Sequence, residues 1–173
     1  MAAPIIVKPA IAEQFENFIK NGRILFFSAP CGFGKTILTD ALLKGKRGYK
    51  VRRLNAGTDD ISRIFEDTGA SAGDRESRKA QGKDTDWDVL VIDDLQMLQE
   101  ESDWQLLCEL IRARADRHFV LLSRGVPPGS LMAFRYTGLM TVLQAEDLLF
   151  DGDDIRKALN AYNVTVTDSE LHA

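Results

Sequence analysis

A glycine-rich segment that ends in lysine and threonine is the part of this sequence best suited to do chemistry. It reads Ser28-Ala29-Pro30-Cys31-Gly32-Phe33-Gly34-Lys35-Thr36 and follows an apolar run. Backbone N–H groups in such a turn, and in the helix that follows it, point inward and wrap an anion. Lys35 can reach the β- and γ-phosphates of a nucleotide, and the Thr36 hydroxyl can bind Mg²⁺. The predicted nucleotide-binding residues of this segment are Pro30, Cys31, Gly32, Phe33, Gly34, Lys35, Thr36 and Ile37.

Two acids at the end of a second apolar run support this interpretation. The strict phosphate-binding pattern has glycine where this chain has Ala29, so a glycine-rich turn that merely carries a lysine is an alternative. Asp88–Asp94, however, predicts a buried parallel strand with carboxylates at its carboxyl end, where ligands bind in open α/β sheets. Asp93 is expected to bind Mg²⁺ together with Thr36, partly through water. Asp94 is expected to orient or deprotonate the attacking water, although a lone acidic strand end often caps a helix.

An arginine follows a third apolar run. Arg124 comes directly after the predicted strand 118–123, and if this strand neighbours the Asp93 strand, the guanidinium faces the γ-phosphate. There it would distinguish ATP from ADP and stabilise charge in the transition state. Arg135 is a second candidate for this sensing role. Gln96 is either a residue that positions water or a polar residue that faces a helix.

Strands and helices alternate along the chain around these residues. Strands are expected at 23–28, 50–54, 88–94, 118–123 and 139–143, and basic neighbours favour an edge position for 50–54. Helices are expected at 11–19, 36–43, 58–65, 104–111 and 153–162, the last capped by Asp151 or Asp153, and 69–86 is expected to be a mobile polar loop. This alternation predicts a three-layer α/β/α P-loop NTPase fold with a central, mostly parallel five-stranded sheet. The strands that carry Lys35 and Asp93 are expected near one another at the centre of the sheet.

Composition narrows the classes of function. The net charge is −4, and no basic face is broad enough to indicate direct contact with DNA. Cys31 and Cys108 have no spacing typical of a metal site or disulfide, although Cys31, at a helix N-terminus, is a candidate for oxidation. No signal peptide and no apolar run of about 20 residues is visible, which predicts a cytoplasmic protein without membrane contact.

The chain is expected to contain one main domain and the start of another. Residues 1–145 are predicted to form the nucleotide-binding domain, and 146–173 to begin a small helical subdomain. A helix that starts near Thr167 and is cut within a turn indicates that the chain is the N-terminal fragment of a longer protein.

Four motifs together resemble a known family. They are 28–36, Val91-Ile92-Asp93-Asp94, Leu121-Leu122-Ser123-Arg124, and 143–150 leading into an acidic helix. Their order and spacing are similar to those of the signal-transduction ATPases with numerous domains (STAND), specifically the nucleotide-binding domain of MalT-like, LuxR-type bacterial transcription regulators. That family tolerates a small residue other than glycine at the position of Ala29. The resemblance is thin across 57–86, and the segment 55–60 carries fewer acids than the family often has there.

The resemblance implies a switch that exchanges ADP for ATP, self-associates in the ATP state and resets by slow hydrolysis, a weak ATPase activity. It assigns Asp93, Asp94 and Arg124 to hydrolysis. It also implies that Val7 and Pro9, in the N-terminal segment 1–22, pack on the adenine. Inducer-binding repeats and a helix-turn-helix DNA reader belong to other domains of such regulators, so this fragment is not expected to contact DNA itself.

Two other functions remain open at this stage. A small-molecule or nucleoside kinase shares the phosphate loop and the parallel sheet, and Arg75, Arg78 and Lys79 lie in a stretch that a kinase would use as a lid. Against the kinase, paired acids suit water activation. The third interpretation is a module that binds nucleotide without hydrolysing it, because catalytic arginines can come from a neighbouring subunit.

Overall fold

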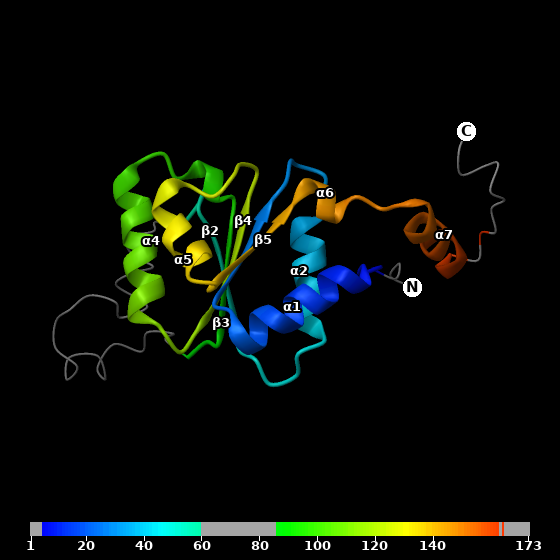
Figure 1. The fold of residues 1–173 in the computed structure, drawn as a ribbon, viewed down its shortest axis with the longest axis horizontal. Helices are drawn as coiled ribbons and strands as arrows, with labels where there is room; N and C mark the ends of the chain where they lie inside the picture. Colours follow the sequence, from blue (N-terminus) through cyan, green and yellow to red (C-terminus); the bar gives the residue numbers. More distant parts are fainter. Residues whose placement is uncertain (1–4, 60–85, 163, 165–173) are drawn as a thin grey trace.

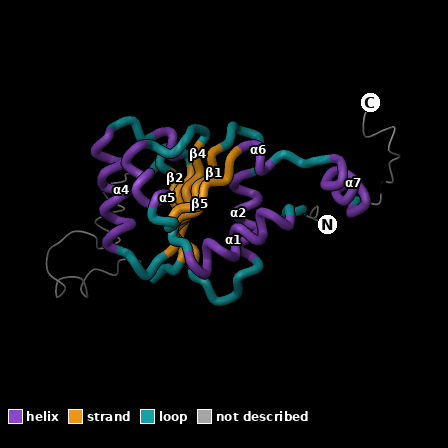
Figure 2. The backbone as a smooth tube through the Cα atoms, viewed as in Figure 1, coloured by secondary structure: helices purple, strands orange, loops and turns teal. Residues whose placement is uncertain are grey.

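The protein was analysed as a computed structural model, which describes residues 5–59, 86–162 and 164. Five strands form one parallel sheet: β1 (Ile24–Ser28), β2 (Val51–Asn55), β3 (Val89–Asp93), β4 (His118–Ser123) and β5 (Met140–Gln144). Their order across the sheet is β2-β3-β4-β1-β5, and every neighbouring pair is parallel. All five carboxyl ends therefore meet at one edge of the sheet (Figure 2).

Helices cover both faces of this sheet (Figure 1). On one side lie α1 (Pro9–Asn21) and α2 (Lys35–Lys44), and on the other lie α4 (Glu101–Ala113) and α5 (Met132–Tyr136). Short 3₁₀ turns, η2 (Leu95–Met97) and η3 (Gly129–Leu131), follow β3 and precede α5. After β5 come α6 (Ala145–Leu148) and α7 (Gly152–Ala161), and α7 stands apart from the sheet, beyond the start of α1. No helix in the described part of the chain is long and apolar enough to cross a membrane.

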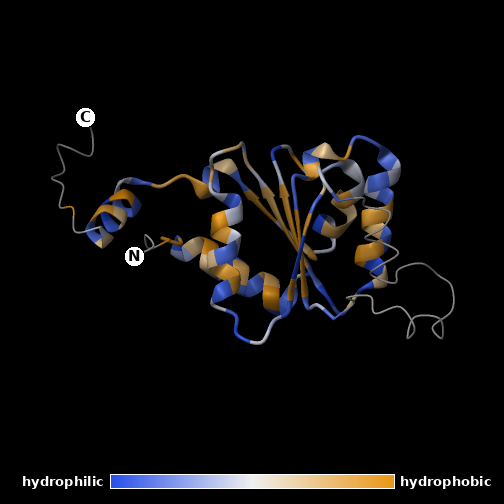
Figure 3. Ribbon diagram, turned by 180° about the vertical axis from the view of Figure 1, so that it is seen from behind, coloured by the Kyte–Doolittle hydropathy of each residue, from blue (hydrophilic) through white to orange (hydrophobic). Residues whose placement is uncertain are grey.

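The two layers of core follow from the alternation of side chains along each strand. In β1, Ile24 and Phe26 face α4 and α5, whereas Leu25 and Phe27 face α1 and α2. Strands β3 and β4 divide their residues in the same way, so the three central strands are apolar on both faces (Figure 3). Burial on both faces is why these strands read as continuous apolar runs, without polar alternation. The first four residues of β1 are all fully buried.

The predicted three-layer α/β/α fold with a five-stranded sheet is confirmed, and most strand boundaries differ from the expected ones by one residue. β2 is an edge strand and β4 neighbours β3, both as expected. One expectation is corrected: β1 and β3 do not pair, because β4 lies between them. Asp151, one of two candidate caps, caps α7 by accepting a hydrogen bond from the Asp154 N–H. The expected loop 69–86 and the expected start of a helix at 165–173 lie outside the described residues, as does most of the helix expected at 58–65.

A histidine at the opposite end of the sheet from the carboxyl edge makes stability depend on pH. His118 begins β4, and its ring packs edge-on against Phe18 with centroids 5.2 Å apart. Burial lowers the pKa of His118 below its ordinary value of 6.5, and the positive charge of Arg23 lowers it further. Below pH 6.5 the unfolded chain therefore binds a proton that the folded chain resists.

Thermal stability is consequently expected to decrease as the pH falls below 6.5, and His118→Phe is expected to weaken this dependence. Melting temperatures of both proteins between pH 8 and pH 5 measure the effect. Parallel curves for the two proteins would contradict it.

Candidate functional site

The turn between β1 and α2 is shaped by two glycines. Gly32 and Gly34 have φ angles of 89° and 71°, in the left-handed region that residues with a Cβ atom rarely adopt. Gly34 is also the residue at which α2 begins. With these two angles the chain turns from the strand into the helix, so that the first N–H groups of α2 face the carboxyl edge of the sheet.

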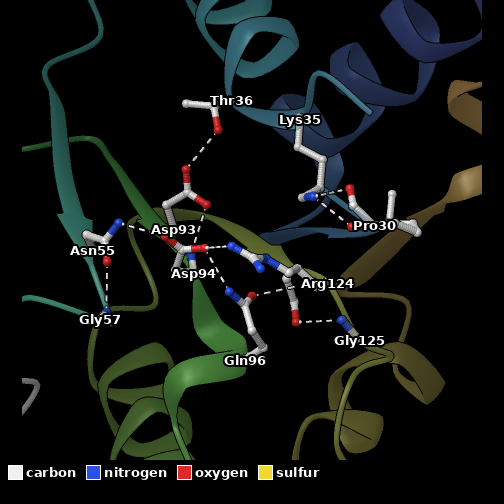
Figure 4. Close-up of polar contacts among 12 residues, drawn as sticks. Pro30, Lys35, Thr36, Asn55, Gly57, Asp93, Asp94, Gln96, Arg124 and Gly125 are labelled. Atoms are coloured by element: carbon white, nitrogen blue, oxygen red, sulfur yellow. Dashed lines mark hydrogen bonds and ion pairs between the residues drawn. The ribbon is translucent and has the colours of Figure 1, made fainter. Parts of the chain in front are cut away.

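Lys35 folds back over this turn. Its ammonium donates hydrogen bonds to the carbonyl oxygens of Ala29 and Pro30, at 2.6 and 2.8 Å (Figure 4). A lysine held in this way lies over the loop without a carboxylate partner. Its charge is available to an anion that enters the loop, because hydrogen bonds to exposed carbonyl groups are readily exchanged.

Thr36 and Asp93 meet across the gap between α2 and β3. The Thr36 hydroxyl donates to Asp93 Oδ2 at 2.8 Å, and Asp93 Oδ1 accepts from the Asp94 N–H at 2.8 Å (Figure 4). A hydroxyl and a carboxylate side by side are the oxygen ligands that Mg²⁺ prefers, and the ion takes its remaining ligands from water and phosphate. Within the described residues no three His, Cys, Asp or Glu side chains gather into a metal site, which fits a metal that is bound together with an anion.

Asp94 is held by three side chains. Its backbone is left-handed, with φ 55°, and its carboxylate accepts hydrogen bonds from Gln96 Nε2 at 2.7 Å and Asn55 Nδ2 at 3.0 Å. The guanidinium of Arg124 lies 3.5 Å from Asp94 Oδ1. These contacts, led by the bonds from Gln96 and Asn55, lower the pKa of Asp94 below its ordinary value. Asp94 is therefore ionised at neutral pH and acts as an oriented acceptor.

Gln96 joins the ends of two neighbouring strands. While its Nε2 donates to Asp94 beyond β3, its Oε1 accepts from the backbone N–H of Arg124 beyond β4, at 3.1 Å. The amide thus fixes the distance between the acid and the arginine (Figure 4). Arg135, the other candidate arginine, is exposed on α5 and does not line this site.

All of these side chains except Asn55 surround one cavity of about 340 Å³ at the carboxyl edge of the sheet. Its lining residues are Cys31, Gly32, Gly34, Lys35, Thr36, Ile37, Asp93, Asp94, Gln96 and Arg124. Six of the eight residues predicted from the turn lie here. Pro30 contributes its carbonyl group to Lys35, and Phe33 points elsewhere.

A second cavity, of about 350 Å³, adjoins the first at Gly34 and Ile37 and is apolar. The residues around it are Ile5, Ile6, Lys8, Ile11, Phe33, Gly34, Ile37, Leu38, Leu148, Phe150 and Tyr162. Val7 and Pro9, which the resemblance places on the adenine, are not among them. Val7 packs into the core between α1 and the sheet, and Pro9 is exposed at the start of α1. Their neighbours Ile6 and Lys8 face the cavity instead.

Sequence reasoning missed two parts of this site. Asn55 is the last residue of β2 and stands beside Asp93 in the strand register, so a polar residue at a strand end was the available signal. The C-terminal segment 148–150 was expected to lead into a subdomain, but its place at the apolar cavity rests on contacts between distant parts of the chain.

Solved structures with the same fold are similar to this chain throughout its length. AMPPCP-bound DnaA from Aquifex aeolicus is 19% identical, with a TM-score of 0.58, and covers 97% of this chain. Domain III of the Thermotoga maritima replication initiation protein DnaA is 18% identical, with a TM-score of 0.54 over 96% of this chain. This chain has the AAA+ P-loop NTPase fold.

The P-loop NTPase fold extends to more distant proteins. A structure of Drosophila ORC bound to AT-rich DNA and Cdc6 has 13% identity and a TM-score of 0.51, and it covers 93% of this chain. The chain spans 57% of the Aquifex DnaA chain, 76% of the Thermotoga one and 66% of the ORC one. No family model and no curated protein sequence matches it. None of these three structures is described as a LuxR-type regulator, so that resemblance stays a prediction.

Proposed function

We propose that this chain is a nucleotide switch that binds ATP and ADP with Mg²⁺ and hydrolyses ATP slowly. One observation carries the proposal: the phosphate loop, the Thr36–Asp93 pair and the Asp94–Arg124 pair line one polar cavity, and an apolar cavity adjoins it. A nucleoside triphosphate has the matching division into an anionic tail and an apolar base. A solved neighbour of the same fold, DnaA from Aquifex aeolicus, is bound to AMPPCP, which supports the choice of ligand.

Each polar residue has a separate task in this proposal. The loop N–H groups and Lys35 hold the phosphates, and Thr36 and Asp93 hold Mg²⁺, which neutralises phosphate charge when it is bound. Asp94 accepts a hydrogen bond from the attacking water and so orients it. Arg124 lies beside Asp94, where it can approach the γ-phosphate. The Ile37 side of the apolar cavity receives the base.

Slow turnover is supported by the engagement of Asp94. Its carboxylate already accepts hydrogen bonds from Asn55 and Gln96 and faces Arg124, so a water must compete with these partners for it. Low activity suits a protein that stores a bound state rather than one that turns over substrate. Together with the motif resemblance, this favours the switch domain of a MalT-like transcription regulator, with inducer-binding and DNA-binding parts in other domains of that regulator.

The kinase alternative lacks a comparable observation. The residues considered for its lid, Arg75, Arg78 and Lys79, lie outside the described part of the chain. A module that binds but does not hydrolyse nucleotide differs from the switch only in turnover. Calorimetric titration with ADP and with ATP, each with Mg²⁺, tests the shared claim of binding, and release of phosphate from ATP separates the two. Absence of heat with both nucleotides would contradict the proposal.

Arg124 is expected to set the preference between the two nucleotides. Arg124→Ala should lower ATP affinity about tenfold and change ADP affinity little, because a guanidinium near the γ-phosphate acts only when that group is present. Calorimetry on both nucleotides measures the ratio. Arg135→Ala is the matched control, since this arginine is exposed on α5. Loss of the preference in the Arg135 variant alone would reassign the sensing role.

A further inference from the structure

The apolar cavity is closed by two segments from opposite ends of the described chain. Ile5, Ile6 and Lys8 form the N-terminal side, and Leu148, Phe150 and Tyr162 form the C-terminal side. Only Phe33, Gly34, Ile37 and Leu38 come from the phosphate loop and α2. The shape of the cavity therefore depends on how the segment before α1 meets the segment around α7.

Lys8 makes the polar contacts between these two segments. Its Nζ donates a hydrogen bond to the carbonyl oxygen of Leu149 at 2.7 Å and lies 3.4 Å from Asp154 Oδ2. The carbonyl belongs to the segment that enters α7, and the carboxylate lies in the first turn of α7. One ammonium group thus holds both the path of the linker and the start of the helix.

Asp154 requires such a partner. Its side chain is only 7% exposed, and a carboxylate removed from water is stable only when it is paired and hydrogen-bonded. It also accepts a hydrogen bond from the Asp151 N–H, at 3.3 Å, so it fixes the chain at the start of α7. The position of α7 and the charge of Lys8 are therefore linked.

We infer that Lys8 is a positioning residue for the base of the nucleotide: by binding Leu149 and Asp154 it holds the C-terminal segment against the apolar cavity. The inference rests on the proposed function, because it assigns the occupant of this cavity as the nucleobase. Lys8 acts through the segment and does not read the base, since its ammonium is directed to the carbonyl and the carboxylate. Its aliphatic stem forms part of the wall.

Two probes separate the base from the phosphates. ADP uses both cavities, whereas inorganic tripolyphosphate uses only the phosphate loop. Lys8→Met keeps an apolar side chain of similar length but removes the charge, and it is expected to raise the Kd for ADP about tenfold while changing that for tripolyphosphate by less than about twofold. Lys8→Arg retains a cation that can bind both oxygens and is expected to restore ADP affinity. Calorimetry with Mg²⁺ measures all the constants, and a thermal melt checks that each variant is folded.

Lys20→Met is the matched control, because it makes the same chemical change at an exposed position near the other end of α1. Asp154→Asn should weaken ADP binding in the same direction, and combining it with Lys8→Met should add little, because both remove one interaction. Unchanged ADP affinity in Lys8→Met, or an equal loss for tripolyphosphate, would overturn the inference. Wild-type protein that binds neither probe would instead refute the proposed function, and wild-type protein that binds both equally would refute only the role of the apolar cavity.

Discussion

Lys35→Ala is expected to lower the affinity for both ATP and ADP by about a hundredfold or more. In the nucleotide-free chain the ammonium is bound to the carbonyl oxygens of Ala29 and Pro30, which places it directly over the loop. Exchange of these neutral partners for phosphate oxygens gives charge-assisted hydrogen bonds, each of which contributes about 1.5–3 kcal/mol. Two such bonds account for a loss of this size, since about 1.4 kcal/mol corresponds to a factor of ten.

The fold is expected to survive this change. The Pro30 carbonyl is exposed, so water can replace the ammonium there, and no described core residue packs on the Lys35 charge. Calorimetry gives the affinities, and circular dichroism with a thermal melt gives the state of folding. Lys44→Ala, in the last turn of the same helix, is the matched control, because Lys44 does not line the phosphate cavity. Binding that is equal in the wild-type and Lys35→Ala proteins would remove the phosphate loop from the proposed function.

The sequence was sufficient to predict those parts of the site that depend on local structure. Gly32 and Gly34 occupy left-handed positions in a turn, and Asp93 and Arg124 stand at or just after the ends of apolar strands. In a parallel sheet such strand ends meet at one edge, so the strand pattern alone placed these residues together. The same reasoning applies to β2, yet Asn55 was overlooked because an amide at a strand end has many ordinary explanations.

What could not be predicted depends on contacts between distant or irregular segments. Residues 5–8 precede α1 and have no repeating pattern, so nothing in the sequence distinguishes Ile6 and Lys8, which face the apolar cavity, from Val7, which faces the core. The bond between Lys8 and Leu149 joins residues 141 positions apart. The order of β1, β4 and β3 is similarly a property of the whole sheet, and local propensity does not encode it.

Asp94→Asn is expected to reduce the rate of ATP hydrolysis by about a hundredfold or more, the lower end of what a positioned acid–base group contributes. Asparagine tolerates the left-handed backbone at this position, where φ is 55°, so the turn after β3 is preserved. The amide has one acceptor oxygen instead of two and no charge. It cannot hold Gln96 and Asn55 and also orient a water, so the water loses its partner.

Binding of ATP is expected to persist in this variant, and even to tighten slightly, because a negative charge near the phosphates is removed. Phosphate release under saturating ATP measures turnover, and calorimetry measures binding. Asp116→Asn is the matched control, since this exposed carboxylate precedes β4 at the opposite end of the sheet. The wild-type rate should show no acidic limb from Asp94 above about pH 4, because the hydrogen bonds from Gln96 and Asn55 lower its pKa. Undiminished hydrolysis in Asp94→Asn would mean that Asp94 serves only to join Asn55, Gln96 and Arg124, and the water would then have to be oriented from another residue of the cavity, with Asp93 the remaining carboxylate.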